Sequence, residues 1–536
     1  MSAIVFDSVS FHYEDPYLQV FEDLSLSVDT RWKTGLVGRN GRGKTTLLNL
    51  LRRKLQPSRG RIDVPVSVFY FPYAPSNPDE TTFRVVKESV APFLAWERRM
   101  SDLLRAQDEQ SLGEYGELLE RYERMGGYEI DAKIEQEFVR MGMDASLLAR
   151  RFRTLSGGEQ TRALIIPLFL KKGAFPLIDE PTNHLDMRGR ALLGAYLAAK
   201  DGFIVVSHDR SFLDSCVDHI VSLNKSDVRV NQGDYSQWRA AMDAEEEFER
   251  RKNENLEREV RSLERAARKR RAWSDKKEHS AKHGDPNLRG MRDKGYLTAR
   301  AADLMQRALA IERRMERKIE EKKDLLKNVE KKRELALVTG LRAPEVLASL
   351  HEVDVTLGGR QVLKGFSLTI RKGEQIAIVG DNGTGKTTIL NVLSGEVRPE
   401  RGTVSLPGHL KIVRAYQIPL WQRGFLREHL ARARIDETRF RNVMAAFGVT
   451  GEVFDRPLQT FSEGERKKVD LCRSFLAPSH LLLWDEPLNY LDVMTREQIE
   501  KVVLERKPTL LFIEHDRYFV ERTATEVVRL SPPVRS

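Results

Sequence analysis

Two glycine-rich segments carry a lysine followed by threonines at the same spacing. The first reads GRNGRGKTT from Gly38 and the second reads GDNGTGKTT from Gly380, so both fit the pattern G-x-x-x-x-G-K-[ST]. Backbone N–H groups of such a loop face phosphate oxygens, the lysine reaches the outer phosphates, and the hydroxyl after it coordinates Mg²⁺. We expect two phosphate sites with these residues: Gly38, Asn40, Gly41, Gly43, Lys44, Thr45 and Thr46, then Gly380, Asn382, Gly383, Gly385, Lys386, Thr387 and Thr388.

A pair of adjacent carboxylates follows an apolar run in each half of the chain. Asp179-Glu180 comes after FPLI, and Asp485-Glu486 comes after HLLLW. Phosphoryl transfer to water needs a carboxylate to hold Mg²⁺ and a second one to orient or deprotonate the water. We predict that each aspartate holds the metal and each glutamate acts on the water, both at the end of a strand.

These motifs recur in one order, so the chain is an internal repeat. The glycine-rich segments start 342 residues apart, whereas LSGGEQ from Leu155 and FSEGER from Phe461 are 306 apart. The first half therefore holds about 36 extra residues, which we place in a helical hairpin within about 90–135. His208 and His515 also recur, each after an apolar run. A lone histidine there is usually structural, but its recurrence favours contact with a γ-phosphate.

The sequence around both loops predicts the elements that position them. KTGLVG and QIAIVG, just before the loops, are typical of buried strands, and TTLLNLL and TTILNVL, just after, are typical of helices. Strand, loop and helix in this order favour an α/β fold in both halves.

Residues 236–345 match neither repeat. Residues 241–340 contain 28 Lys and Arg against 21 Asp and Glu, which is +7 of the net +10 of the whole chain. Apolar residues at 4,3,4 spacing predict two long helices: Leu256, Val260, Leu263 and Ala267, then Leu304, Ala308, Ile311 and Met315. Glycine and proline between them predict a reversal with a basic tip at about 273–297. We favour contact with nucleic acid, the alternative being a solvated spacer.

Length and composition limit the other possibilities. At 536 residues the chain has room for three or four domains. Its two cysteines, Cys216 and Cys472, exclude a disulfide framework and any multi-cysteine metal module. The sequence lacks an 18-residue apolar run and a typical signal peptide, so we expect no membrane span and a cytoplasmic location.

The glycine-rich loop, the LSGGEQ-type signature, the DEP motif and the histidine, in this order and twice, resemble the ABC ATPase superfamily. The resemblance implies ATP and Mg²⁺ as cofactors and hydrolysis of ATP. It implies metal contacts from Thr45, Asp179, Thr387 and Asp485, and catalytic roles for Glu180, Glu486, His208 and His515. It also implies that the halves pair head to tail. Ser156, Gly157 and Gly158 would close on the ATP at Lys386, and Ser462, Gly464 and Glu465 on the ATP at Lys44.

Three positions depart from this family pattern. Gln417 stands where the family has a glutamine in its Q-loop, whereas Tyr73 is the nearest residue to that place in the first half. The second half has the unusual signature FSEGE, and Leu357 replaces an aromatic residue expected to stack on adenine. We expect both sites to hydrolyse ATP, at equal or different rates.

Tandem ABC domains joined by a helical hairpin resemble the ABC-F family of ribosome-binding ATPases. We therefore divide the chain into domains at 1–235, 236–345 and 346–536, the middle one contacting ribosomal RNA and P-site tRNA. The second half further resembles the branch that protects ribosomes from lincosamides, pleuromutilins and streptogramin A. We expect a monomer with these candidate tip residues: Lys282, His283, Leu288, Met291 and Arg292. The alternatives are a housekeeping translation factor, the soluble motor of an exporter and a DNA-repair ATPase.

Overall fold

The computed structural model describes residues 2–14, 17–106, 108–224, 228–282, 337, 343–449 and 451–531. The chain divides into two compact units, one formed by Met1–Trp238 with Arg333–Ser536 and the other by Arg239–Lys332. The first unit contains two α/β domains, and the elements that both domains share follow the same order along the chain.

Each α/β domain is built on a mainly parallel sheet. The strand order is β5-β6-β7-β3-β8-β9 in the first domain and β14-β15-β16-β12-β17 in the second. The strands β7, β15 and β16 are buried along their whole length, which explains the apolar runs FIVV, LLLW and LLFI. The bounds are β3 Lys33–Gly38, β5 Ser67–Phe71, β6 Ala174–Asp179, β7 Phe203–Val206, β8 His219–Leu223, β9 Val228–Gln232, β12 Gln375–Gly380, β14 Ile412–Ala415, β15 Leu481–Asp485, β16 Leu510–Ile513 and β17 Glu526–Leu530.

A three-stranded antiparallel sheet packs against one face of each parallel sheet. The orders are β2-β1-β4 and β11-β10-β13. One apolar core in each domain joins the two sheets to the helix that follows the glycine-rich loop. The bounds are β1 Ala3–Glu14, β2 Tyr17–Asp29, β4 Arg59–Asp63, β10 Val346–Leu357, β11 Arg360–Arg371 and β13 Arg401–Ser405.

Helices complete both domains. In the second domain, helices and the sheet share a core around the fully buried Trp484 and Phe475, whose ring centroids lie 5.7 Å apart. The helices of the first domain are α1 Lys44–Leu51, α2 Thr82–Val90, α5 Ile130–Arg140, α6 Gly157–Leu170, α7 Met187–Ala198 and α8 Arg210–Cys216. Those of the second are α11 Lys386–Leu393, α12 Leu426–Ala433, α13 Glu437–Ala446, α14 Glu463–Leu476, α15 Val493–Arg506 and α16 Arg517–Thr523.

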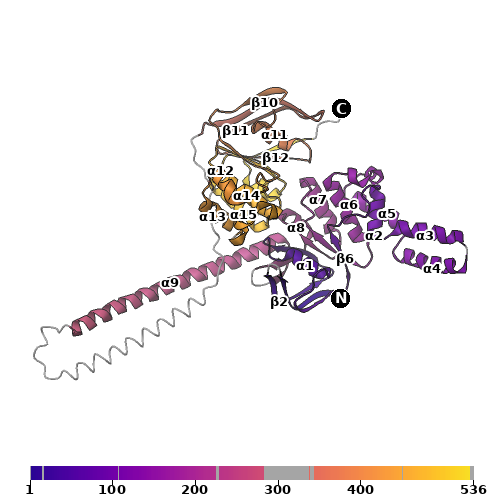
Figure 1. Cartoon of the computed structure of the whole chain (residues 1–536), viewed down its shortest axis with the longest axis horizontal. Helices are drawn as coiled ribbons and strands as arrows, with labels where there is room; N and C mark the ends of the chain where they lie inside the picture. The colour runs from indigo at the N-terminus through magenta and orange to yellow at the C-terminus, as the bar shows by residue number, and fades with distance from the viewer. Residues whose placement is uncertain are drawn as a thin grey trace, which may run out of the picture. The chain divides into compact units, whose positions relative to one another are not determined.

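The first domain also carries an antiparallel pair of helices, α3 Phe93–Ala106 and α4 Glu109–Arg124 (Figure 1). They lie in the stretch where the sequence predicts an inserted hairpin. Phe93 packs edge-on against Tyr122 at 5.5 Å, and Arg99 makes two hydrogen bonds with Glu114, at 2.9 and 2.7 Å. An aromatic contact at the base and an ion pair further out hold the two helices together.

A single helix, α9 Tyr235–Lys282, continues from the first domain for 48 residues (Figure 1). Successive ion pairs between residues four apart support its exposed face, among them Arg251–Glu247 and Arg261–Glu257. Val260, one of the predicted seam residues, is buried. The candidate tip residues from His283 onward and the second predicted arm lie outside the described residues.

The fold is therefore α/β with two tandem domains, as the sequence predicts. Both cysteines are buried in the domain cores, and burial raises the pKa of both thiols. Among the helices that the structure describes, none is long and apolar enough to span a membrane.

Candidate nucleotide sites

The lysine of each glycine-rich loop is folded back onto its own loop. Lys44 Nζ donates to the carbonyl oxygens of Gly38 at 2.7 Å and Arg39 at 3.2 Å. Lys386 Nζ donates to those of Gly380 and Asp381, both at 2.8 Å. Burial lowers the pKa of both ammonium groups. Each is a buried amine whose hydrogen bonds go to carbonyl oxygens of its own loop.

Glycine is required where each loop enters its helix. Gly43 and Gly385, the N-caps of α1 and α11, have φ of 89° and 94°, in the left-handed region. A Cβ atom at Gly43 would lie 2.5 Å from Val20 Cγ1, and one at Gly385 would lie 2.6 Å from Val362 Cγ1. Backbone and packing thus both exclude a side chain, and the helix N-terminus stays open to an anion.

The two predicted catalytic glutamates lie just past their strands. The sequence places each carboxylate pair within a strand end, but β6 and β15 stop at the aspartates, and Glu180 and Glu486 adopt φ of 50° and 46°. Their N–H groups donate to Val206 O at 2.9 Å and Ile513 O at 3.0 Å. The hydrogen bond to the neighbouring strand holds each glutamate in a strained conformation, which turns its side chain toward the histidine.

Each glutamate lies beside the predicted histidine, but the pKa values of the two glutamates are shifted in opposite directions. His208 Nε2 lies 3.2 Å from Glu180 Oε1, and His515 Nε2 lies 3.6 Å from Glu486 Oε1. Burial and the charge of Asp179 raise the pKa of Glu180 to about 8, and burial lowers the pKa of His208 well below its usual range. Burial acts in the same direction on Glu486, but the nearby imidazole of His515 and the hydrogen bond from Gln417 outweigh it and lower its pKa to about 2.

The Q-loop position separates the two sites further. Gln417 Nε2 donates to Glu486 Oε2 at 3.1 Å, and Asn489 Nδ2 donates to the same oxygen at 2.6 Å. In the first domain the Tyr73 hydroxyl instead donates to the backbone oxygen of Leu164 at 3.1 Å. Glu486 therefore has two amide donors, whereas Tyr73 makes its hydrogen bond away from Glu180.

The two aspartates predicted to hold the metal also have different partners. Asp485 accepts from Thr387 Oγ1 at 3.3 Å and from Arg414 Nη2 at 3.2 Å. Asp179 accepts from the hydroxyl of Tyr70 at 3.0 Å. Burial raises the pKa of both carboxyl groups. The Thr387 hydroxyl beside the Asp485 carboxylate is an oxygen donor set that suits Mg²⁺. Beside Asp179 the hydroxyl is that of Tyr70 and not that of the predicted Thr45.

Contacts between the domains join each glycine-rich loop to the other half. Asn40 Nδ2 donates to Tyr490 O at 3.1 Å, and the Asn40 N–H donates to Asp492 Oδ2 at 3.3 Å. A Cβ atom at Gly464, in the second signature, would lie 3.3 Å from Asn40 Nδ2. At the other loop, the Asn382 N–H donates to Asp186 Oδ2 at 3.3 Å.

Both signature serines cap the helix that follows them. Ser156 caps α6 and Ser462 caps α14, each in a capping box closed by a glutamate three residues later, Glu159 or Glu465. Glu465 is thus part of a helix cap in the structure. The capping box orients the first turn of each signature helix, including Gly157, Gly158 and Gly464.

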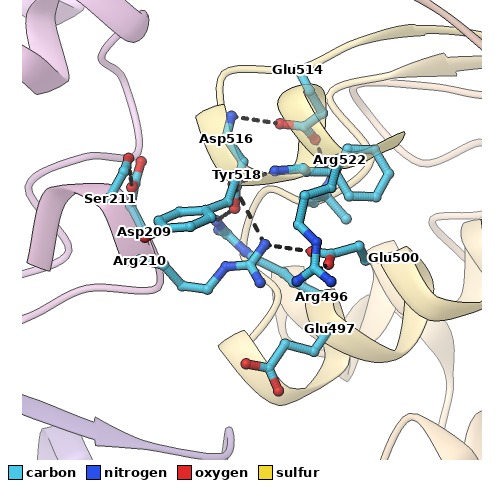
Figure 2. Close-up of polar contacts among 12 residues, drawn as sticks. Asp209, Arg210, Ser211, Arg496, Glu497, Glu500, Glu514, Asp516, Tyr518 and Arg522 are labelled. Carbon is cyan, nitrogen blue, oxygen red and sulfur yellow. Dashed lines mark hydrogen bonds and ion pairs between the residues drawn. The ribbon is translucent and has the colours of Figure 1, made fainter. Parts of the chain in front are cut away.

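A buried ionic network also joins the two domains (Figure 2). Arg210 Nη2 lies 2.7 Å from Glu500 Oε2 and 3.8 Å from Asp516 Oδ1. The hydroxyl of Tyr518 donates to Asp214 Oδ2 at 3.0 Å. In Figure 2, Arg210 extends from the first domain toward α15 and α16 of the second.

Sequence reasoning missed several residues of these sites. Asp186 and Asp492 end the repeated segments LIDEPTNHLD and LWDEPLNYLD, and that recurrence was the available signal. Arg210 and Arg414 contact partners 290 and 71 residues away in the sequence. A single arginine with a distant partner leaves no local pattern.

Comparison with known proteins matches this architecture. The model of the ABC transporter family matches residues 21–183 and 363–489, which is more than half of the chain. This chain belongs to the ABC transporter family. It is an ATPase with two ATP-binding domains, and each matched range contains one of the glycine-rich loops described above.

Relatives of this ABC protein align along almost its whole length. The ribosome protection protein VmlR of Bacillus subtilis is 27% identical over 538 residues, which cover 98% of this chain and 86% of that protein. The energy-dependent translational throttle protein EttA of Escherichia coli K12 is 26% identical over 541 residues, covering 96% and 89%. The ATP-binding protein Uup of the same strain is 26% identical, covering 95% and 77%.

A solved structure is also similar in fold. The archaeal ribosome recycling factor aABCE1, in complex with the ribosomal stalk protein aP1, gives a TM-score of 0.57 at 19% identity. The alignment covers 97% of this chain and 87% of that one. At this identity the similarity supports the tandem ABC fold alone.

Proposed function

We propose that this ABC protein is a ribosome-binding ATPase of the ABC-F type. One observation carries the proposal: VmlR and EttA, whose names refer to the ribosome and to translation, align with at least 96% of this chain, including the segment between the ATPase domains. In this proposal a monomer binds cytoplasmic ribosomes while ATP holds its domains together, and hydrolysis releases it.

The site residues act in two composite ATP sites. Lys44 and Lys386 bind the outer phosphates, and Glu180 and Glu486 activate the attacking water. Thr45 with Asp179, and Thr387 with Asp485, hold Mg²⁺, which supplies charge neutralisation on the phosphates when bound. The contact between Asn40 and the second half supports closure of Ser462 and Gly464 on the first site. The Asn382–Asp186 contact supports the reciprocal closure of Ser156 on the second.

The segment 236–345, as a domain of its own, makes the ribosomal contact. Its described part is the long basic helix α9, and the proposed tip at about 273–297 lies near and beyond its end. Phosphate charge on ribosomal RNA supplies affinity, and the tip supplies position beside P-site tRNA.

The finer function we propose is protection of the ribosome from antibiotics of the peptidyl-transferase centre. The similarity to VmlR, a ribosome protection protein, supports it. The nearly equal similarity to EttA, a translational throttle, favours a second candidate, a housekeeping factor that acts on stalled ribosomes.

Trapping the ATP-bound form tests ribosome binding. In the double variant Glu180→Gln and Glu486→Gln, phosphate binding remains while water activation is lost. We expect this variant to sediment with ribosomes in ATP, and the unmodified protein to dissociate as ATP is consumed. Sedimentation with membranes instead of ribosomes, or equal weak binding with ATP and with ADP, would contradict the proposal.

A growth panel separates the two candidate functions. The protein is expressed in a sensitive host, which is then exposed to a lincosamide, a pleuromutilin and streptogramin A. Protection against at least one drug class supports ribosome protection, and the Glu180→Gln, Glu486→Gln variant is the inactive control. Ribosome binding without any protection supports the housekeeping factor.

A further inference from the structure

A buried lysine holds the Q-loop of the second domain. Lys467, in α14, is 1% exposed. Its Nζ donates to Tyr416 O at 2.7 Å, to Gln417 O at 3.3 Å and to Asp485 O at 3.2 Å. An ammonium group has three donors, and here each has a carbonyl partner. Lys467 therefore ties the signature helix to the loop after β14 and to the end of β15.

Asp470, one turn further along α14, fixes the same loop from its N–H side. It accepts from the Tyr416 N–H at 2.9 Å and from Arg473 Nε at 3.0 Å. Arg473 also donates to Arg414 O. Carbonyl and N–H of Tyr416 are thus both held by side chains of α14, and the backbone before Gln417 has little freedom to move.

The residue positioned in this way contacts the proposed general base. Gln417 Nε2 donates to Glu486 Oε2 at 3.1 Å. Lys467 contacts the backbone of Gln417 on one side and that of Asp485, the neighbour of Glu486, on the other. The ammonium group of Lys467 thus fixes the backbone of Gln417 relative to the backbone beside Glu486, and so holds the Gln417 amide near the Glu486 carboxylate.

The first domain offers an internal comparison. The residues 306 positions before Lys467 and Asp470 are Thr161 and Leu164. This domain has Tyr73 at the Q-loop position, with its hydroxyl on Leu164 O. The domain that has the glutamine has the buried lysine, and the domain that lacks the glutamine lacks the lysine. A buried charge is costly, so its confinement to one copy points to a task particular to that copy.

We propose that Lys467 is a positioning residue of the second ATP site, which acts by holding Gln417 on Glu486. The inference rests on the roles proposed above for Gln417 and Glu486. It predicts that Lys467 affects turnover of ATP at this site rather than its binding.

The test measures steady-state ATP hydrolysis in the full chain. A Glu180→Gln background leaves the second site to turn over, and Lys467→Met is added to it. We expect kcat to fall about tenfold or more, with KM for ATP changed less than about threefold, because a misplaced catalytic group costs rate rather than affinity. Adding Gln417→Ala to Lys467→Met should lower kcat little further, since the two substitutions remove one interaction.

Two controls separate positioning from loss of stability. Lys87→Met removes another buried lysine, which pairs with Glu97 and Asp131 at 2.8 Å in the first domain. It should lower the melting temperature without the loss of kcat. In a Glu486→Gln background, which reports the first site, Lys467→Met should have an effect at least about threefold smaller than in the Glu180→Gln background.

The possible outcomes distinguish the positioning role of Lys467 from the role proposed for Gln417, on which it rests. If Gln417→Ala lowers kcat while Lys467→Met does not, or if the two losses multiply, the inference is wrong and the role of Gln417 stands. If Gln417→Ala leaves kcat unchanged, the proposed role of Gln417 is wrong and the inference fails with it. Equal losses at both sites would also overturn the inference, because they indicate a general defect.

Discussion

At the scale of single residues, Glu180 and Glu486 occupy the same place in the repeat, but their pKa values are shifted in opposite directions. Both are largely buried beside a histidine. Two amide donors stabilise the Glu486 carboxylate. The negative charge of Asp179 destabilises the Glu180 carboxylate and adds to the effect of burial on its pKa. A base must be ionised to accept a proton from water, so this difference gives the two sites different pH dependences.

We expect hydrolysis at the first site, measured in a Glu486→Gln variant, to rise with pH up to about pH 8. The raised pKa of about 8 leaves Glu180 mostly protonated at neutral pH, and its ionised fraction grows roughly tenfold per pH unit below that pKa. The second site, measured in a Glu180→Gln variant, should be flat from pH 6 to 9, because the pKa of Glu486 is about 2. These pKa values belong to the protein without nucleotide, so kcat/KM is the quantity to measure, and parallel kcat/KM profiles for the two variants would contradict the assignment.

At the scale of elements, the junction between each glycine-rich loop and its helix tolerates no side chain. We expect Gly43→Ala to abolish nucleotide binding at the first site and to destabilise the protein by more than the ~1 kcal/mol of a left-handed alanine, because its Cβ would lie 2.5 Å from Val20 Cγ1. Equilibrium unfolding and binding of a fluorescent ATP analogue measure the two effects.

Gly395→Ala is the matched control for that substitution. Gly395 has φ of 77°, but a Cβ atom there would have no neighbour within 4 Å. Gly395→Ala should lower the unfolding free energy only by the cost of an alanine in the left-handed conformation, and should leave nucleotide binding intact. Equal unfolding energies for the two variants would mean that the contact with Val20 relaxes at no cost.

The elements were also the part that the sequence predicts best. Buried parallel strands such as β15 and β16 are continuous apolar runs, so the strands before and after each motif are readable locally. The left-handed conformation of Glu180 was missed. The strand ends at Asp179, one residue earlier than expected, and nothing in the local residue types marks that end. Lys467 was missed too, since a lysine in a charged helix looks like a solvated residue until its three carbonyl partners are known.

At the scale of the whole molecule, the two repeat copies of one arginine have different partners. Arg210 pairs with Glu500 across the domains, whereas its repeat counterpart Arg517 pairs with Glu521 in its own helix. The repeat counterpart of Glu500, 306 positions earlier, is Gly194, which has no side-chain carboxylate that could pair with Arg517. A cavity of about 900 Å³ lies next to Arg517 and is also lined by Ala191. The Arg210–Glu500 ion pair thus joins the duplicated halves on one side of the repeat, and its repeat counterpart does not.

We expect Arg210→Met to destabilise the protein by about 2 kcal/mol, because it breaks a charged hydrogen bond between two buried groups. Arg517→Met removes an ion pair whose arginine is 68% exposed, and should change the unfolding free energy by no more than about 0.5 kcal/mol. Denaturant unfolding of both variants makes the comparison. Equal losses would show that the contact across the domains contributes no more than a surface pair.

The buried thiols of Cys216 and Cys472 allow movement of the two halves relative to each other to be measured with dyes attached to introduced cysteines. A thiolate is the form that reacts with maleimide dyes, and these two groups are covered and held protonated. A donor and an acceptor fluorophore can therefore be attached to cysteines introduced on the surface of each half, with the native pair left in place. Energy transfer between the dyes would then report, molecule by molecule, whether the halves swing about the Arg210–Glu500 ion pair when ATP is added.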